Sequence, residues 1–335
     1  MTAAAAGPPG RLIHTGQVVV DLVLGVSAWP PRGGDTFARW QTAAVGGGFN
    51  VMAAARREGA AVVYTGGHGS GPFGDMARAA LAASGVTVTA PASAGRDTGF
   101  SVVLVDDAAE RTFVSAAGAE FDACLASMAD AKPTPRDLVY VSGYSLAQGG
   151  KRPLLLEWLA GLDGGVRVLF DPSPLVGELP ADALGVLASR RCLWSLNLRE
   201  ATSLAQRPEL WSQPPVSQAA LATACHTELA SGLALALGRA VILRLGEQGA
   251  MVAQPPPPGA PPAPARVVEV PAQPVVAVDT NGAGDAHCGA LAAALLRGLP
   301  LVDAVRRANA VAALAVTRPG PADWRGSAHP GADAV

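Results

Sequence analysis

The stretch Asp279-Thr-Asn-Gly-Ala-Gly-Asp285 places a glycine-rich turn directly before an alanine-rich run that extends to Arg297. That run predicts a helix beginning near Asp285, and the apolar residues of Pro274–Val278 predict a short strand on the other side of the turn. Backbone N–H groups are accessible where side chains are this small, and the N-terminus of a helix carries a partial positive charge. The stretch therefore predicts an anion hole suited to a phosphoryl group that gains charge during transfer.

Asp285 stands at the mouth of this predicted hole, where a carboxylate can take the proton from an attacking hydroxyl group. A plainer interpretation makes Asp285 the N-cap of a helix and the glycines a turn, because aspartate is common at that position. That interpretation does not explain the full Asp-Thr-x-Gly-Ala-Gly-Asp string. The stretch favours phosphoryl transfer, with Asp285 as general base.

Outside this stretch, short β-branched runs alternate with longer helical patterns along the 335 residues. The predicted strands are Gln17–Leu22, Ala61–Thr65, Leu138–Ser142, Val166–Phe170, Leu193–Leu196 and Ala240–Leu245. The predicted helices are Val51–Glu58, Asp75–Ser84, Arg152–Leu162, Ser217–Leu237, Asp285–Arg297 and Leu301–Val316. Such alternation, with nearly continuous apolar strands, predicts an α/β fold whose mostly parallel sheet is covered by helices on both faces.

Two segments break the alternation. Gly99–Val105 and Arg111–Ser115 are strand-like and are joined by the polar turn Asp106–Glu110, which predicts a hairpin in a small β appendage. Gln254–Pro274 contains nine prolines among its twenty-one residues, which predicts a surface loop insertion within one domain.

Composition excludes several classes of protein. The formal net charge of −2 leaves no basic face for nucleic acid. No uninterrupted apolar run reaches the roughly 18 residues of a membrane span, and residues 1–10 lack the charged start of a signal peptide. The four cysteines are widely separated, which is typical of reduced thiols. We expect a cytoplasmic protein with flexible tails at residues 1–10 and 326–335.

Several motifs together resemble the ribokinase-like (PfkB) family of sugar and nucleoside kinases. Asp279–Asp285 is similar to the C-terminal signature of that family, and Gly46-Gly-Gly-Phe-Asn50 is similar to its N-terminal signature. Shorter similarities follow in the expected order at Gly16–Leu24, Asn197–Glu200, Leu243–Gly249 and Ala308–Ala310. The resemblance implies one domain over residues 11–325, with a central sheet, flanking helices and a small β lid from about residues 14–45 and 97–118.

The resemblance also implies a function, an ATP-dependent kinase that phosphorylates a hydroxyl group of a small carbohydrate. It assigns the acceptor sugar to Asp21, Gly47, Gly48 and Asn50, and catalysis to Asp285 with the backbone of Gly282, Ala283 and Gly284. It assigns the nucleotide to Asn197, Glu200, Gly246, Gly249, Asn281 and Asn309. Asn197 and Glu200 are expected to position Mg²⁺ through water, and Asp279 and Thr280 to border a monovalent cation such as K⁺. A homodimer formed through the lid is expected as well.

Three alternatives remain open. A nucleoside kinase of the same family needs an apolar slot for the base, although only 5% of the residues are aromatic. A non-catalytic regulator that binds sugar or nucleotide has no evident use for Asp285. The loop Gly69–Gly74 matches the dinucleotide-binding pattern, with Asp97 downstream, but Pro72 removes one of its N–H groups.

Three departures from the family pattern bear on the site. Met52 stands where a small residue is usual, and Ala286-His287-Cys288 stands where many members have an aromatic pair. We interpret His287 as a packed helix residue. Tyr144 occupies about the position of a sugar-binding glutamate in ribokinase, which argues against ribose as the substrate.

Overall fold

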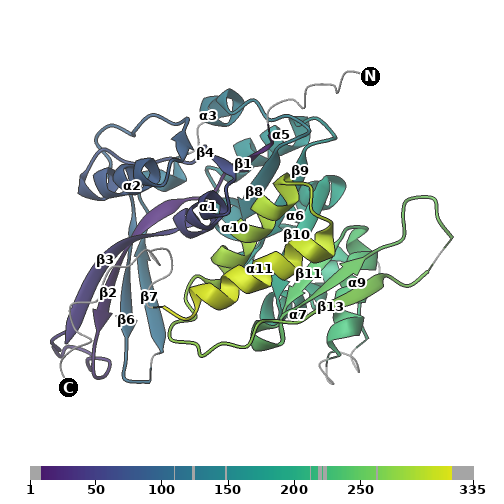
Figure 1. Cartoon of the computed structure of the whole chain (residues 1–335). Coiled ribbons are helices and arrows are strands. Elements are labelled where there is room, and N and C mark those ends of the chain that lie inside the picture. The colour runs from purple at the N-terminus through teal and green to yellow at the C-terminus, as the bar shows by residue number, and fades with distance from the viewer. Residues whose placement is uncertain are drawn as a thin grey trace.

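The computed structural model describes residues 9–318 except 109, 123–124, 148, 212, 218–220, 222–224 and 262. Within these residues a nine-stranded sheet forms the centre of the molecule (Figure 1). Its strand order is β13 (Arg266–Val270), β12 (Ala250–Gln254), β11 (Val241–Arg244), β10 (Arg191–Asn197), β9 (Arg167–Asp171), β8 (Leu138–Ser142), β1 (Arg11–His14), β4 (Ala61–Tyr64) and β5 (Thr87–Val88). Neighbouring strands are parallel, apart from the antiparallel pairs β11–β12 and β12–β13.

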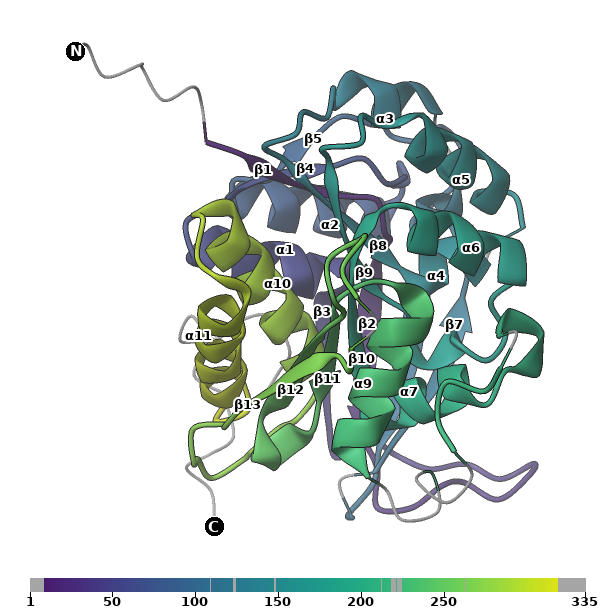
Figure 2. The ribbon, with the colours of Figure 1, turned by 90° about the vertical axis from the view of Figure 1, so that its right-hand side faces the viewer.

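Helices cover both faces of this sheet, as the view in Figure 2 shows. One hydrophobic cluster joins the sheet to α1 (Gly48–Arg57), α2 (Pro72–Ala83), α10 (Ala283–Leu296) and α11 (Leu301–Ala315). A second cluster joins the opposite face to α3 (Leu125–Asp130), α5 (Arg152–Gly161), α6 (Ala181–Ser189), α7 (Leu198–Ala205) and α9 (His226–Leu237). The short helix α4 (Gly143–Ala147) follows β8 directly. The predicted α/β fold is confirmed.

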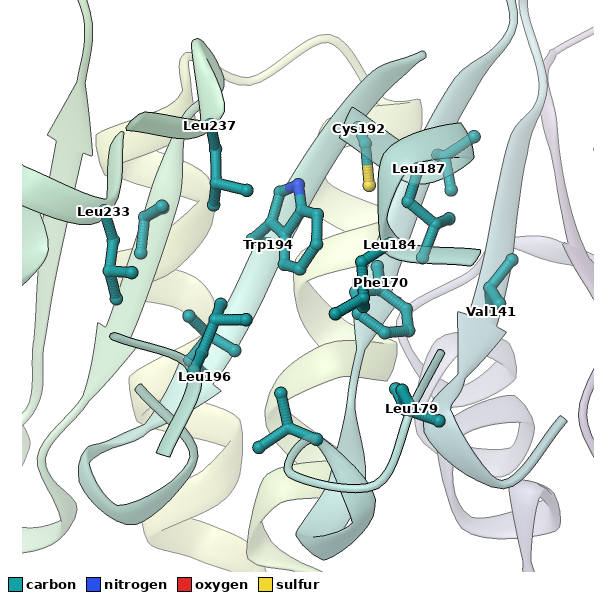
Figure 3. Packing of buried hydrophobic residues seen from close by; sticks show 14 of the residues in the cluster. Val141, Phe170, Leu179, Leu184, Leu187, Cys192, Trp194, Leu196, Leu233 and Leu237 are labelled. Carbon is teal, nitrogen blue, oxygen red and sulfur yellow. The ribbon is translucent and has the colours of Figure 1, made fainter. Parts of the chain in front are cut away.

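In the second cluster, apolar side chains of α6 and α9 pack against those of the neighbouring strands (Figure 3). Leu184 and Leu187 lie three residues apart on α6, so both side chains meet the sheet. Beneath them Phe170 and Trp194 pack edge to face, with ring centroids 4.9 Å apart and planes at 85°. Burial of each such side chain contributes about 1.5–3 kcal/mol, and this holds the neighbouring strands β9 and β10 in place.

A second sheet of four strands forms the lid. Its order is β3 (Trp40–Gly47), β2 (Val18–Gly25), β6 (Phe100–Val105) and β7 (Arg111–Ala116). The β6–β7 hairpin is the one predicted from the sequence. β2 pairs with β3 antiparallel and with β6 parallel. The β6–β7 hairpin therefore lies next to β2 and β3 in one sheet, although residues 48–99 separate them in the sequence.

One strand prediction is wrong, and one strand of the main sheet was not predicted. The strand predicted at Gln17–Leu22 is confirmed as β2 of the lid, and the strand that enters the main sheet just before it, Arg11–His14, lies between β4 and β8. Its ends, Arg11 and His14, are polar, which hid the strand in the sequence. Pro274–Val278 forms no strand; Val276 is 85% exposed. Proline at both 271 and 274 removes N–H groups that a strand needs.

Two other predicted segments have different bounds. The proline-rich insertion is shorter than Gln254–Pro274, because Arg266–Val270 pairs antiparallel with β12 as strand β13. Of the helix predicted at Ser217–Leu237, the part His226–Leu237 forms α9, and residues 218–220 and 222–224 lie outside the described residues.

Candidate active site

The two sequence signatures meet where α1 packs against α10. The Asn50 Nδ2 atom donates a hydrogen bond of 3.0 Å to Asp285 Oδ2, across 235 positions of the sequence. A glycine on α10 permits this close approach, because a Cβ atom at Gly289 would lie 2.3 Å from the Val51 carbonyl oxygen. Helix packing thus holds the side chains of Asn50 and Asp285 next to each other.

Asp285 lies in the first turn of α10, surrounded largely by protein. Burial raises the pKa of its carboxyl group to about 7, and the negative charge of Asp171 acts in the same direction. The hydrogen bond from Asn50 opposes this shift, because it favours the charged carboxylate. A carboxyl group with a pKa of about 7 is balanced between its two protonation states at neutral pH, which suits a general base.

The residues predicted to hold the acceptor lie on and next to the lid strands. Burial raises the pKa of Asp21, on β2, to about 6. A Cβ atom at Gly46 would come within 2.1 Å of Asp21 Oδ2, so only glycine fits beside this carboxylate. Gly47 has a φ of 61° at the N-cap of α1, and the Gly48 N–H donates to the Gln17 carbonyl at 2.7 Å. The structure therefore brings all four predicted acceptor residues to one end of α1, together with Gly46, which belongs to the same signature but was given no role.

In the turn before α10, where the anion hole is predicted, the amides of Asn281 and Ala283 already have acceptors within the turn. Gly282 caps the helix with φ 73° and ψ 2°, a left-handed conformation that favours glycine. The Asn281 N–H donates to Asp279 Oδ1 at 2.8 Å, and the Ala283 N–H donates to the Thr280 carbonyl at 3.3 Å. Gly284 lies in the first turn, whose N–H groups lack intrahelical acceptors, so its amide is available to an anion.

A buried arginine lies beside this turn. Arg244, at the end of β11, forms ion pairs with Asp171 at 3.0 Å and with Glu200 at 3.3 Å. Its Nη1 atom would be 2.8 Å from a Cβ at Gly284, so the guanidinium borders the first turn of α10. Sequence reasoning missed Arg244 and Asp171. A single arginine within the apolar run Val241–Leu245 was the available signal, since a buried charge needs partners.

Asn197 and Glu200 form a capping box at the start of α7. The Asn197 side chain accepts from the Glu200 N–H at 2.8 Å, and the Glu200 carboxylate accepts from the Asn197 N–H at 2.8 Å. Burial raises the pKa of Glu200. Next to this box is a pocket of about 370 Å³, lined by Asn197, Leu198, Arg199, His226, Arg244, Leu245, Gly246 and Gln248. The pocket joins two of the predicted nucleotide residues, Asn197 and Gly246, to Arg244.

Two predicted nucleotide residues lie at a different place. The Asn309 Nδ2 atom donates to the carbonyl groups of Val270 at 2.8 Å and Pro271 at 3.2 Å. Gly249 approaches the same backbone, since a Cβ there would be 2.2 Å from the Val270 carbonyl oxygen. Gly249 and Asn309 therefore both fix the end of β13.

Other residues singled out in the sequence are packed into the fold. His287 and Met52 are buried, and burial lowers the pKa of His287 to about 3, so its imidazole is neutral. Tyr144 is 43% exposed at the start of α4. The Gly69–Gly74 loop binds the Asp97 carboxylate through the N–H groups of Phe73 at 3.1 Å and Gly74 at 2.7 Å. Those amides already have an anion, which argues against a dinucleotide site.

A partly buried carboxylate at a helix N-terminus, between an α/β sheet and a β lid, defines a site for phosphoryl transfer to a small molecule. Comparisons with known proteins agree. A profile of the pfkB family of carbohydrate kinases matches residues 11–325. A relative in Escherichia coli (strain K12), the uncharacterized sugar kinase YegV, is 33% identical over 302 residues, which cover 90% of this chain and 87% of the relative.

Solved structures share the fold. A ribokinase of Arabidopsis thaliana, complexed with ribose and ATP, has a TM-score of 0.70 at 20% identity, covering 93% of this chain and 94% of that one. The adenosine kinase of Sinorhizobium meliloti has a TM-score of 0.73 at 18% identity, covering 94% and 96%. This chain belongs to the pfkB family of carbohydrate kinases, and is a phosphotransferase that acts on a sugar hydroxyl group.

Among the described residues, no group of three or more histidine, cysteine, aspartate or glutamate side chains is arranged to hold a metal ion. In the same part of the chain, no helix has the length and apolar character that crossing a membrane requires.

Proposed function

We propose that this sugar kinase transfers the γ-phosphoryl group of Mg-ATP to a hydroxyl group of a small carbohydrate, with Asp285 as the general base. The observation that carries the proposal is the hydrogen bond from Asn50 to Asp285. It joins the acceptor side of the site, at the start of α1, to the anion hole at the start of α10. A hydroxyl group held at Asp21 and Asn50 would lie beside the base.

Each group then has a chemical task. Asp21 and Asn50 hold the sugar by directional hydrogen bonds, and Gly47 and Gly48 let the backbone approach it. Asp285 accepts the proton of the attacking hydroxyl group as the new oxygen–phosphorus bond forms. The Gly284 N–H, the helix N-terminus and Arg244 stabilise the negative charge on the phosphoryl oxygens. The γ-phosphate is received from ATP in the pocket beside Asn197 and Gly246.

The residues around Arg244 fit a magnesium ion bound with a nucleotide. Mg²⁺ prefers oxygen ligands, keeps several waters and needs only one or two carboxylates in addition to phosphate. Two carboxylates, Asp171 and Glu200, share the single positive charge of Arg244, so the cluster can accept a further cation. Asn197 and Glu200 would hold it through water, and the ion would neutralise charge on the phosphates.

The test is ADP release from Mg-ATP across a panel of ketohexoses, aldohexoses, pentoses, 2-keto-3-deoxy acids and nucleosides. We expect turnover with a sugar, and its loss in Asp285→Asn while nucleotide still binds. Turnover with nucleosides alone would replace the proposal by a nucleoside kinase. ATP binding without turnover on any acceptor would favour a regulator, and a fully active Asp285→Asn variant would contradict the base assignment.

We also propose a homodimer formed through the lid. Strands β3 and β7 are the edges of the lid sheet, and they carry Trp40 and Phe113, which are 44% and 50% exposed. Exposed edges and aromatic side chains are features that a second subunit can cover. Sedimentation of the full chain should give the mass of two chains, and Phe113→Ser should shift it toward one.

A further inference from the structure

A lid residue reaches into the loop that precedes the anion hole. Arg111 begins strand β7, and its Nη2 atom lies 2.6 Å from Asp279 Oδ1. The two side chains are 25% and 12% exposed, so the pair is largely shielded from solvent. The same Asp279 oxygen accepts the Asn281 N–H at 2.8 Å. One carboxylate therefore fixes the turn internally and binds the lid.

These contacts decide whether a monovalent cation fits at the predicted position beside Asp279 and Thr280. The guanidinium group of arginine is charged at every accessible pH, and it already neutralises the Asp279 carboxylate. A K⁺ ion on this carboxylate would lie within a few ångströms of that charge and would be repelled by it. Thr280 is exposed and adds no second carboxylate. The residues therefore do not fit a bound K⁺ while Arg111 is in place.

We propose that Arg111 takes the place of a monovalent cation in this protein, and that it positions the Asp279–Asp285 turn from the lid. The ion pair neutralises Asp279, so the carboxylate orders the Asn281 amide without repelling an incoming phosphate. Because Arg111 belongs to the lid and Asp279 to the turn before α10, the arrangement also couples the position of the lid to the shape of the anion hole. Arg111 is thus a positioning residue, and catalysis requires no K⁺.

The activity test rests on the proposed kinase function. Wild-type kcat/KM should change by less than about 2-fold between chloride salts of K⁺, Na⁺ and tetramethylammonium at equal ionic strength. Arg111→Ala should lose about 10- to 100-fold in tetramethylammonium, as expected for a displaced turn, and should regain most of it in K⁺ or guanidinium. Arg39→Ala is the matched control, because Arg39 pairs with Asp107 elsewhere on the lid; it should show neither effect.

A second measurement does not depend on activity. Thermal unfolding of the wild type should give the same Tm in K⁺ and tetramethylammonium, whereas the Tm of Arg111→Ala should rise in K⁺. This readout separates failure of the present inference from failure of the kinase proposal, since it needs no acceptor. Strong K⁺ activation of the wild type overturns the inference, as does an Arg111→Ala variant that keeps full activity or that no cation rescues.

Discussion

The hydrogen bond between Asn50 and Asp285 makes a quantitative prediction about pH. The substitution Asn50→Ala removes the side-chain donor that favours the charged form of Asp285, whose pKa is about 7. A hydrogen bond to a charged group is worth about 1.5–3 kcal/mol, and about 1.4 kcal/mol corresponds to one pKa unit. The pKa of Asp285 should therefore rise to about 8–9 in the variant.

The consequence is a shift in the acidic limb of the pH–rate profile. A general base must be ionised, so kcat/KM for the acceptor should rise with pH through about 7 in the wild type. In Asn50→Ala that rise should move upward, which costs about 5- to 50-fold at pH 7 beyond any loss that persists at pH 9.5. The persistent loss reports sugar binding by Asn50, and the displaced limb reports the base.

The assay is ADP release at saturating Mg-ATP and low acceptor concentration, from about pH 5.5 to 9.5. Asn309→Ala is the matched control, because Asn309 is an equally buried asparagine whose amide binds the Val270 and Pro271 carbonyls. Its acidic limb should stay at the wild-type position. If the limb of Asn50→Ala also stays there, Asn50 does not tune the base and the pH argument is refuted.

Other consequences can be measured directly. Asp285→Asn should lower kcat by about 10²–10⁴-fold, or about 3–5 kcal/mol, with little change in nucleotide affinity by calorimetry. The same variant should be more stable at pH 8 by about 2–4 kcal/mol in urea unfolding. Folding raises the pKa of the Asp285 carboxyl group from 3.8 to about 7. The wild-type protein is therefore fully stabilised by the neutral carboxyl group below pH 3.8, and it loses this stability as the pH rises through 7. If Asp285→Asn were as much more stable than the wild type at pH 4 as at pH 8, this reasoning would be contradicted. Gly46→Ala, which crowds Asp21, should raise the acceptor KM far more than the ATP KM in steady-state assays. Gly289→Ala should destabilise the fold by about 1–3 kcal/mol by overpacking, whereas Gly185→Ala, on an open face of α6, should stabilise it by about 0.5–1 kcal/mol; similar denaturation midpoints for both would argue against tight α1–α10 packing.

Much of the fold could be predicted because the deciding patterns are local. The alternation of apolar strands and helical runs, and the polar turn between Gly99–Val105 and Arg111–Ser115, are visible within short windows. Strand β1 was missed because its polar ends are satisfied by distant partners: Arg11 binds Asp137 at 2.9 Å and His14 stacks on Tyr140. Pro274–Val278 was wrongly predicted as a strand because its residues are apolar. A strand also needs a neighbouring strand to pair with, and apolar composition alone does not provide one.

The candidate site, too, was predicted only where the signal is local. Asn50 and Asp285 were identified because each belongs to a dense motif. Arg244, Asp171 and Arg111 were not, because their importance comes from ion pairs that form only after distant segments have packed. Asn197 and Glu200 were identified as a unit through the family resemblance, which gave no indication that each caps the other's backbone. Contacts between remote residues are what local patterns cannot specify.

The distance along the chain between α1 and α10 has a consequence for biosynthesis. Asn50 is translated early and waits for its partner until residue 285 has been made, with most of the main sheet in between. The residues proposed to hold the acceptor are therefore synthesised before the proposed base. If Asp285 is the base, a chain that ends before α10 lacks it, and we expect such a product to be inactive. Under the proposed mechanism, activity would report a chain in which both α1 and α10 have been made and have packed together.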